Sequence, residues 1–186
     1  MTGQMMRKAW SRMAVAMLAV LVLAGCGGGM KIEDFAGRTP ELRLEEYFAG
    51  RTRAAGLFED RFGTVRRTFV VDIDGTWDGT TLTLDEDFTY NDGEKQRRIW
   101  RLTRTGDRMW EGRADDVIGV AQGREAGNAF QFGYRINLKV GDSTWEVRFD
   151  DWMFRIDEET VLNTAKVYRW GIWIGTVQLA FRRTPA

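Results

Sequence analysis

The residues of this chain that could do chemistry are carboxylates and arginines on a strand-like hairpin. Glu86 and Arg98 fall on two successive segments of alternating apolar and charged residues, 81–90 and 96–104. Burying two charges is costly unless they are paired, and an inward pair can hold the polar end of a ligand beside an apolar wall. The alternatives are a structural salt bridge and a pair at a wet cavity mouth.

Two adjacent acidic pairs, Asp115-Asp116 and Asp150-Asp151, add further candidates. Paired carboxylates act as acid and base in glycoside hydrolysis, and carboxylate oxygens also bind calcium. Adjacent residues on a strand point to opposite faces, so neither pair converges by itself, and solvated turn residues are the simpler interpretation. One member of each pair, Asp116 and Asp151, could still face Glu86 across a cavity.

The chain has no histidine and one cysteine. It therefore cannot build a Ser-His-Asp or Cys-His nucleophile, an imidazole zinc site or an imidazole proton shuttle. Any catalysis would depend on carboxylates, lysine, tyrosine or a borrowed cofactor. The composition favours a binding or structural protein over an enzyme without deciding it, and it indicates neither a cofactor nor a metal site.

The turn after Tyr90 predicts the register of the hairpin. Asn91-Asp92-Gly93 suits a three-residue loop that ends in a left-handed glycine. This loop sets Glu86 opposite Arg98 on the apolar face, and we expect these two to form an ion pair. The predicted ligand-binding residues are Glu86, Arg98, Trp100, Leu84, Trp77, Asp116 and Asp151.

The pattern from residue 55 onward predicts the strands that must position these side chains. Aromatic and β-branched residues alternate with charged ones between glycine-containing turns. We expect about nine or ten strands, with tight turns at Asp74-Gly75 and Asp78-Gly79 and a bulge around Asp150-Asp151-Trp152. The segments are 55–61, 65–73, 76–77, 81–90, 96–104, 108–113, 117–123, 129–140, 144–156, 161–169 and 173–182.

A short helix is expected ahead of the strands. Thr39 suits the N-cap and Pro40 the first helical position, and Gly50 ends the segment. Short loops and one apolar face per strand then predict a single antiparallel up-and-down barrel, which leaves no unpaired edge. Its outward positions are charged rather than apolar, unlike a transmembrane barrel. The predicted fold is all-β and lipocalin-like.

The N-terminus is typical of a secreted lipoprotein precursor. Arg7, Lys8 and Arg12 precede the apolar stretch 13–24, and Leu23-Ala24-Gly25-Cys26 resembles the site that a bacterial lipoprotein signal peptidase cleaves. Acylation of Cys26 would anchor the protein to a membrane. The alternative is an ordinary signal peptide with an incidental cysteine.

These features predict a signal peptide at 1–25, a lipidated cysteine and flexible tether at 26–37, and a barrel domain at 38–186. Gly27 follows the cysteine at the position where an aspartate is the usual signal for retention in the inner membrane. We therefore expect the protein at the periplasmic face of the outer membrane. The 27 basic residues match the 27 acidic ones, and three of the basic residues lie in the signal peptide. The mature chain therefore lacks the basic surface that nucleic acid requires.

Several motifs resemble one family of proteobacterial lipoproteins, the domain of unknown function 3833. They lie at Asp72–Gly79, Leu84–Trp100, Ala114–Gly119, Gly127–Ala129 and Asp150–Met153. The resemblance covers nearly the whole mature chain and implies no assigned reaction. Members of this family tend to be encoded near lipid-modifying enzymes, which implies a fatty acyl ligand.

The sequence leaves three functions open. The first is an anchored barrel that binds or carries a fatty acyl chain or lipid. The second is an envelope structural or assembly protein with a filled core, docking a protein partner through exposed aromatics such as Trp170 and Trp173. The third is a carboxylate-based hydrolase or isomerase that uses Glu86 with Asp116 or Asp151.

Overall fold

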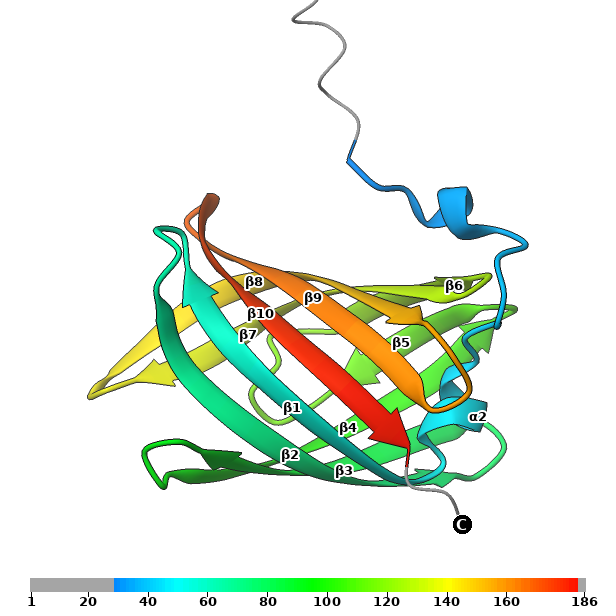
Figure 1. Ribbon diagram of the computed structural model, residues 1–186, viewed down its shortest axis with the longest axis horizontal. Coiled ribbons are helices and arrows are strands. Elements are labelled where there is room, and N and C mark those ends of the chain that lie inside the picture. The colour runs from blue at the N-terminus through cyan, green and yellow to red at the C-terminus, as the bar shows by residue number, and fades with distance from the viewer. Residues whose placement is uncertain (1–28, 184–186) are drawn as a thin grey trace, which may run out of the picture. The chain divides into compact units, whose positions relative to one another are not determined.

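The computed structural model describes residues 29–183, so the predicted signal peptide and lipidated Cys26 lie outside the described residues. Ten antiparallel strands form a closed barrel in the order β1-β10-β9-β8-β7-β6-β5-β4-β3-β2, which confirms the all-β, up-and-down prediction (Figure 1). The strands are β1 (Gly50–Asp60), β2 (Val65–Trp77), β3 (Thr81–Tyr90), β4 (Lys95–Gly106), β5 (Met109–Arg113), β6 (Ala121–Ala126), β7 (Ala129–Val140), β8 (Ser143–Arg155), β9 (Thr160–Arg169) and β10 (Ile172–Arg183).

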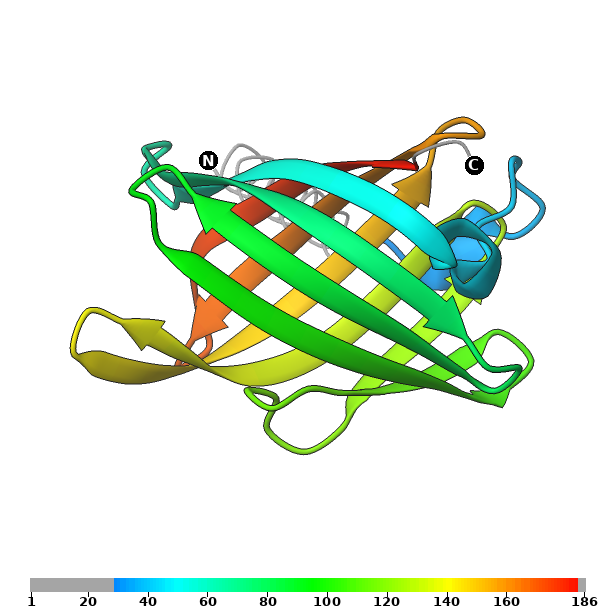
Figure 2. The same ribbon diagram turned by 90° about the horizontal axis from the view of Figure 1, so that it is seen from below.

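The two ends of the barrel differ. The helix α2 (Leu44–Phe48) lies at the end where β1 begins and β10 finishes, and its Leu44, Tyr47 and Phe48 are buried (Figures 1 and 2). We call this the closed end. The turns that follow β1, β3, β7 and β9 lie at the opposite end, which we call the mouth.

The predicted start of the helix was wrong. The helix begins at Leu44 rather than Pro40, and Arg43 in front of it is extended and makes no side-chain cap. Instead the Leu44 amide donates a 3.0 Å hydrogen bond to Glu125 Oε1 from β6. The first amide of the helix therefore finds its hydrogen-bond acceptor on a distant strand, and local capping preferences do not predict such a partner.

The predicted turn at Asp74-Gly75 was also wrong, because β2 runs through it to Trp77. A Cβ at Gly75 would lie 1.8 Å from the Phe48 carbonyl oxygen, so the glycine is required by the close approach of the helix end. The turn at Asp78-Gly79 is present, with Gly79 at φ 99° and Asp78 Oδ1 accepting hydrogen bonds from the Thr80 and Thr81 amides.

The expected bulge around Asp150-Asp151-Trp152 is absent, since β8 pairs without a register shift with both β7 and β9. The alternation looked unsettled because both faces of β8 are covered here. Asp151 faces inward, while Trp152 packs under a 3-10 helix, η2 (Ile32–Phe35), with the Phe35 and Trp152 ring centroids 5.8 Å apart. The packed unit begins at Ile32.

The hydrophobic core falls into three clusters, all made of residues between Ile32 and Phe181. The largest fills the closed end, where Leu42, Leu82 and Trp110 are completely buried. Every core cluster that the structure describes therefore lies within residues 29–183. None of the helices described is long and apolar enough to cross a membrane.

Candidate functional site

The interior of the barrel holds a cavity of about 1030 Å³. It extends from Leu44 and Phe48 of α2 to the mouth, where Asp60, Asp92 and Asp142 border it. Inward apolar side chains of the strands form most of its wall. They include Phe58, Phe69, Val71, Ile73, Leu84, Phe88, Trp100, Leu102, Phe130, Phe132, Ile136, Phe149, Val167, Val177 and Leu179.

The hairpin β3–β4 has the register that its loop predicts. Glu86 pairs with Arg98, Leu84 with Trp100, and Gly93 has a φ of 84°. Leu84, Glu86, Arg98 and Trp100 all line the cavity. The local turn therefore places four of the predicted site residues on the inner wall.

The predicted ion pair between Glu86 and Arg98 is replaced by a different one. Arg98 donates from Nη2 and Nε to Asp116 Oδ2, at 2.7 and 3.1 Å. Asp116 does not line the cavity, but its carboxylate pairs with Arg98, which does. Glu86 keeps its place beside Arg98 without being its salt-bridge partner.

The loop 114–120 brings Asp116 to Arg98. Because β5 and β6 are short, the loop crosses to β7, where the Asn137 amide donates to the Asp116 carbonyl at 2.9 Å and Val117 forms an isolated bridge with Ile136. The strand predicted at 117–123 was thus misplaced, and β6 begins only at Ala121. No local sequence pattern predicts that the loop 114–120 covers the part of the barrel wall that the short strands β5 and β6 leave open.

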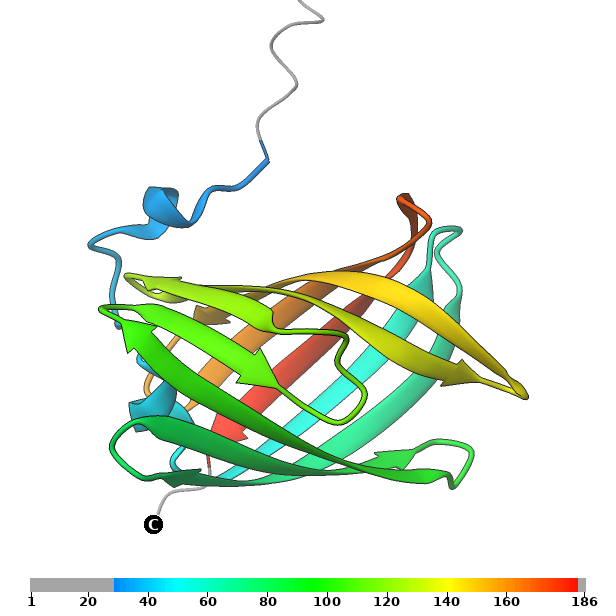
Figure 3. The same cartoon turned by 180° about the vertical axis from the view of Figure 1, so that it is seen from behind.

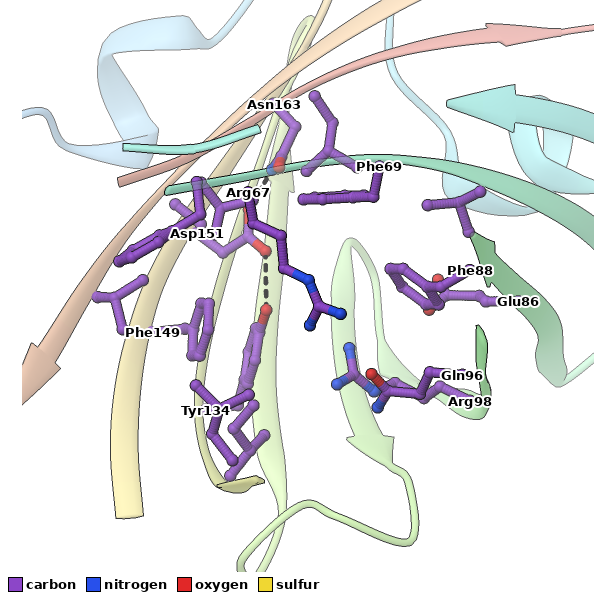
Figure 4. A pocket seen from close by; sticks show the side chains of 18 of the residues that line it. Arg67, Phe69, Glu86, Phe88, Gln96, Arg98, Tyr134, Phe149, Asp151 and Asn163 are labelled. Carbon is purple, nitrogen blue, oxygen red and sulfur yellow. Dashed lines mark hydrogen bonds between the residues drawn. The ribbon is translucent and has the colours of Figure 1, made fainter. Parts of the chain in front are cut away.

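A second polar group lies on the other side of the cavity (Figure 4). Tyr134 from β7 donates a 3.1 Å hydrogen bond to Asp151 Oδ2, and Asn163 Nδ2 from β9 donates to Asp151 Oδ1. Asp151 is 6 % exposed and Asn163 equally so. We call Tyr134, Asp151 and Asn163 the Asp151 triad.

Burial shifts the protonation of both inward carboxyl groups. It raises the pKa of Glu86 from 4.5 to about 7, opposed by Arg98 and reinforced by Asp116 and Asp151. It likewise raises the pKa of Asp151 from 3.8 to about 7, opposed by the hydrogen bonds from Asn163 and Tyr134. Near neutral pH each carboxyl therefore exchanges readily between its protonated and ionised forms.

Arg67 is a lumen residue that the sequence analysis missed. Its guanidinium lies over the Tyr90 ring at 3.5 Å and donates to Asp92 and Glu94 at the mouth, and Figure 4 shows it pointing into the cavity. The signal was present, because Arg67 is in phase with Phe69 on β2. Asn163 was missed in the same way, although it is in phase with the buried Val161, Ala165 and Val167 of β9.

Trp77 does not line the cavity. It lies half-buried at the closed end, where its ring is 5.8 Å from that of the buried Trp110 and packs against the filled part of the core. The sequence predicted that Trp77 would line the cavity. Its position along β2 instead places it at the end of the barrel that α2 fills. Within residues 29–183 no group of three or more His, Cys, Asp or Glu side chains is placed to hold a metal ion.

Comparisons with solved structures show where this fold recurs. A protein of unknown function from the DUF3598 family of Nostoc punctiforme has a TM-score of 0.59 at 14 % identity, covering 78 % of this chain and 50 % of its own. The chain thus spans half the length of that protein. The S-type phycobiliprotein lyase of Guillardia theta has a TM-score of 0.57 at 11 % identity, covering 84 % of this chain and 94 % of its own.

No curated protein matches the chain. A sequence profile does, that of the family described as protein of unknown function (DUF3833), and the match extends over residues 20–183. This span includes every strand of the barrel and agrees with the resemblance carried by the motifs. The chain belongs to the DUF3833 family.

Proposed function

We propose that this protein is a lipoprotein, anchored through Cys26 to the periplasmic face of the bacterial outer membrane, whose barrel binds or carries a fatty acyl chain or similar lipid. The cavity is the observation that carries the proposal. At about 1030 Å³ it reaches the upper end of the roughly 300–1,000 Å³ range of small-molecule sites. A filled core, which the partner-docking alternative requires, would leave no such space.

The lining fits an apolar ligand with one polar end. Aromatic and aliphatic side chains form the wall, and the polar groups gather at Glu86 with Arg98 and at the Asp151 triad. Few, convergent polar groups in an apolar cavity are what fixes a ligand's orientation. The likeness in fold to a phycobiliprotein lyase supports a small-molecule ligand as well.

The charges around the lumen favour an uncharged polar end over a free carboxylate. In the interior, the guanidinium of Arg98 lies near three carboxyl groups, those of Glu86, Asp116 and Asp151. The Arg98 guanidinium is already paired with Asp116. At the mouth, Arg67 is held by Asp92 and Glu94. A hydroxyl, ester or amide group can donate to or accept from these side chains without adding a negative charge beside them.

Native mass spectrometry tests this proposal. Residues 29–186, secreted to the periplasm and purified without detergent, should carry a mass in the lipid range that organic extraction removes. The extracted protein should then bind a monoacylglycerol more tightly than the fatty acid of equal length. A clean protein mass that stays unchanged after incubation with both lipids and with phospholipid would refute the proposal.

A matched pair of variants locates the binding. Val177 lines the cavity, whereas its neighbour Gln178 on β10 is exposed on the outer face. Val177→Trp should fill part of the lumen and abolish the bound mass, and Gln178→Trp should leave it unchanged. Equal binding by both variants would place the ligand outside the barrel.

A further inference from the structure

Five large apolar side chains are exposed together on the rim of the mouth. Phe62 is 77 % exposed and Val65 51 % in and beside the turn between β1 and β2. Trp170 is 83 % exposed, Ile172 54 % and Trp173 42 % in and beside the turn between β9 and β10. We call these five residues the rim patch.

The two turns are neighbours in the barrel wall. Strands β1 and β10 pair as far as Asp60 and Gly175, and the Arg61 amide donates a 3.0 Å hydrogen bond to the Ile174 carbonyl. Figures 1 and 3 show the two turns side by side at the mouth. Asp60 and Ile174 also border the cavity, so the rim patch adjoins its opening.

Trp170 occupies a backbone position that disfavours it. Its φ is 52° and that of Gly171 is 78°, as in a two-residue hairpin turn of type I′. Asn, Asp and Gly dominate such positions, and a bulky side chain there is a conformational outlier. The ring is almost fully exposed, so packing within the barrel does not explain the residue, and an outlier of this kind points to a function.

Each turn pairs an aromatic ring with an arginine. The Arg61 guanidinium lies 4.7 Å from the Phe62 ring centroid, and the Arg169 guanidinium lies 4.1 Å from that of Trp170 and 3.8 Å from that of Trp145. Among the described residues neither arginine forms a salt bridge with a carboxylate. Both guanidiniums are therefore available to an anionic group that meets the rings.

We propose that the rim patch docks the mouth of the barrel onto a phospholipid bilayer. Tryptophan and phenylalanine on protruding turns suit the interfacial zone of a membrane, where an amphipathic ring is apolar at one end and wet at the other. Arginines at the same level complement lipid phosphates. Docking there would open the cavity toward the lipid phase.

Vesicle sedimentation tests the docking directly. Residues 29–186 are mixed with vesicles of phosphatidylethanolamine and phosphatidylglycerol, and the bound fraction is measured. Trp170→Asn with Phe62→Ser should weaken partitioning by about tenfold or more, because two large apolar anchors are lost. Asn also suits the left-handed position, so Trp170→Asn should not lower the thermal midpoint, and loss of fold cannot explain loss of binding.

Met109→Ser is the matched control, since Met109 is an apolar side chain 49 % exposed at the closed end, and it should bind vesicles as the unaltered protein does. Replacing Arg61 and Arg169 with Gln should weaken binding to vesicles that contain phosphatidylglycerol and remove its salt dependence. Failure of the unaltered protein to bind vesicles would overturn the proposal. So would a concentration-dependent dimer that Trp170→Asn abolishes, because the patch would then join two copies.

Docking and ligand binding are separable. Val177→Trp, which fills the lumen, should bind vesicles normally, and the Trp170→Asn protein should still accept a monoacylglycerol presented in solution. Loss of vesicle binding on filling the lumen would overturn the docking proposal, because the attraction would then arise from the cavity rather than the rim. Failure of docking in the other tests leaves the ligand-binding proposal untouched.

Discussion

Glu86 and Arg98 are cross-strand partners on the inner wall, yet the Arg98 guanidinium is bound by Asp116 from another part of the chain. The arginine thus lies between two carboxyl groups, one facing the cavity and one behind it. This arrangement neutralises Arg98 without using Glu86. Glu86 is left with a raised pKa and a free face toward the lumen.

Removing Asp116 should destabilise the barrel. Asp116→Ala leaves Arg98 without its salt-bridge partner in a largely buried position, which we expect to cost about 1–3 kcal/mol in the free energy of unfolding. Asp115→Ala, next to it but exposed, should change that free energy by less than about 0.5 kcal/mol. Urea denaturation followed by circular dichroism measures both, and similar losses would show that the loop rather than the ion pair matters.

Stability should fall as the pH rises from about 4 to 7. The folded-state pKa values of Glu86 and Asp151, about 7, lie above their ordinary values of 4.5 and 3.8. In this window the folded state binds more protons than the unfolded state, so raising the pH favours unfolding, and the effect levels off above pH 7.

The variants Glu86→Gln and Asp151→Asn isolate these two groups from the other carboxylates. Each should flatten the fall in unfolding free energy between pH 4 and 7 relative to the unaltered protein, because the substituted amide does not titrate. Denaturant titrations at a series of pH values provide the comparison. A variant whose slope equals that of the unaltered protein would show that its carboxyl has an ordinary pKa.

Gly75 should not tolerate a side chain. Gly75→Ala places a Cβ against the Phe48 carbonyl and must shift α2 or β2, which we expect to cost about 1–3 kcal/mol. Gly133→Ala is the control, because Gly133 also lies within a strand and a Cβ there meets nothing within 4 Å. Its expected effect is neutral or slightly stabilising. Thermal unfolding distinguishes the two, and equal midpoints would contradict the close approach of the helix.

The N-terminal segment should stabilise the barrel through Phe35. Phe35→Ala removes the ring that packs on Trp152 and Phe154, and we expect a loss of about 2–4 kcal/mol. Phe62→Ala, a change of the same size at a 77 % exposed position, should cost less than about 0.5 kcal/mol. If both variants unfold at the same denaturant concentration, Phe35 does not stabilise the barrel, and the predicted tether at 26–37 stands.

The sequence by itself determined most of the strands and the β3–β4 register. Both depend on short-range physics: inward residues recur with a period of two, and Gly93 suits the left-handed position that closes a three-residue loop. The same alternation indicates Arg67 and Asn163 as inward residues once it is applied to polar as well as apolar side chains. Leu84, Glu86, Arg98 and Trp100 were placed correctly on the wall for this reason.

Only the tertiary structure decided the partners and the depth of each side chain. Asp116 reaches Arg98 because two short strands leave a gap that their loop fills, and Trp77 is excluded from the cavity because α2 fills its end of the barrel. Gly75 and Trp152 were misread because a helix and the N-terminal segment cover them. These contacts join residues far apart in the chain, and their energies depend on shape and burial that no local pattern encodes.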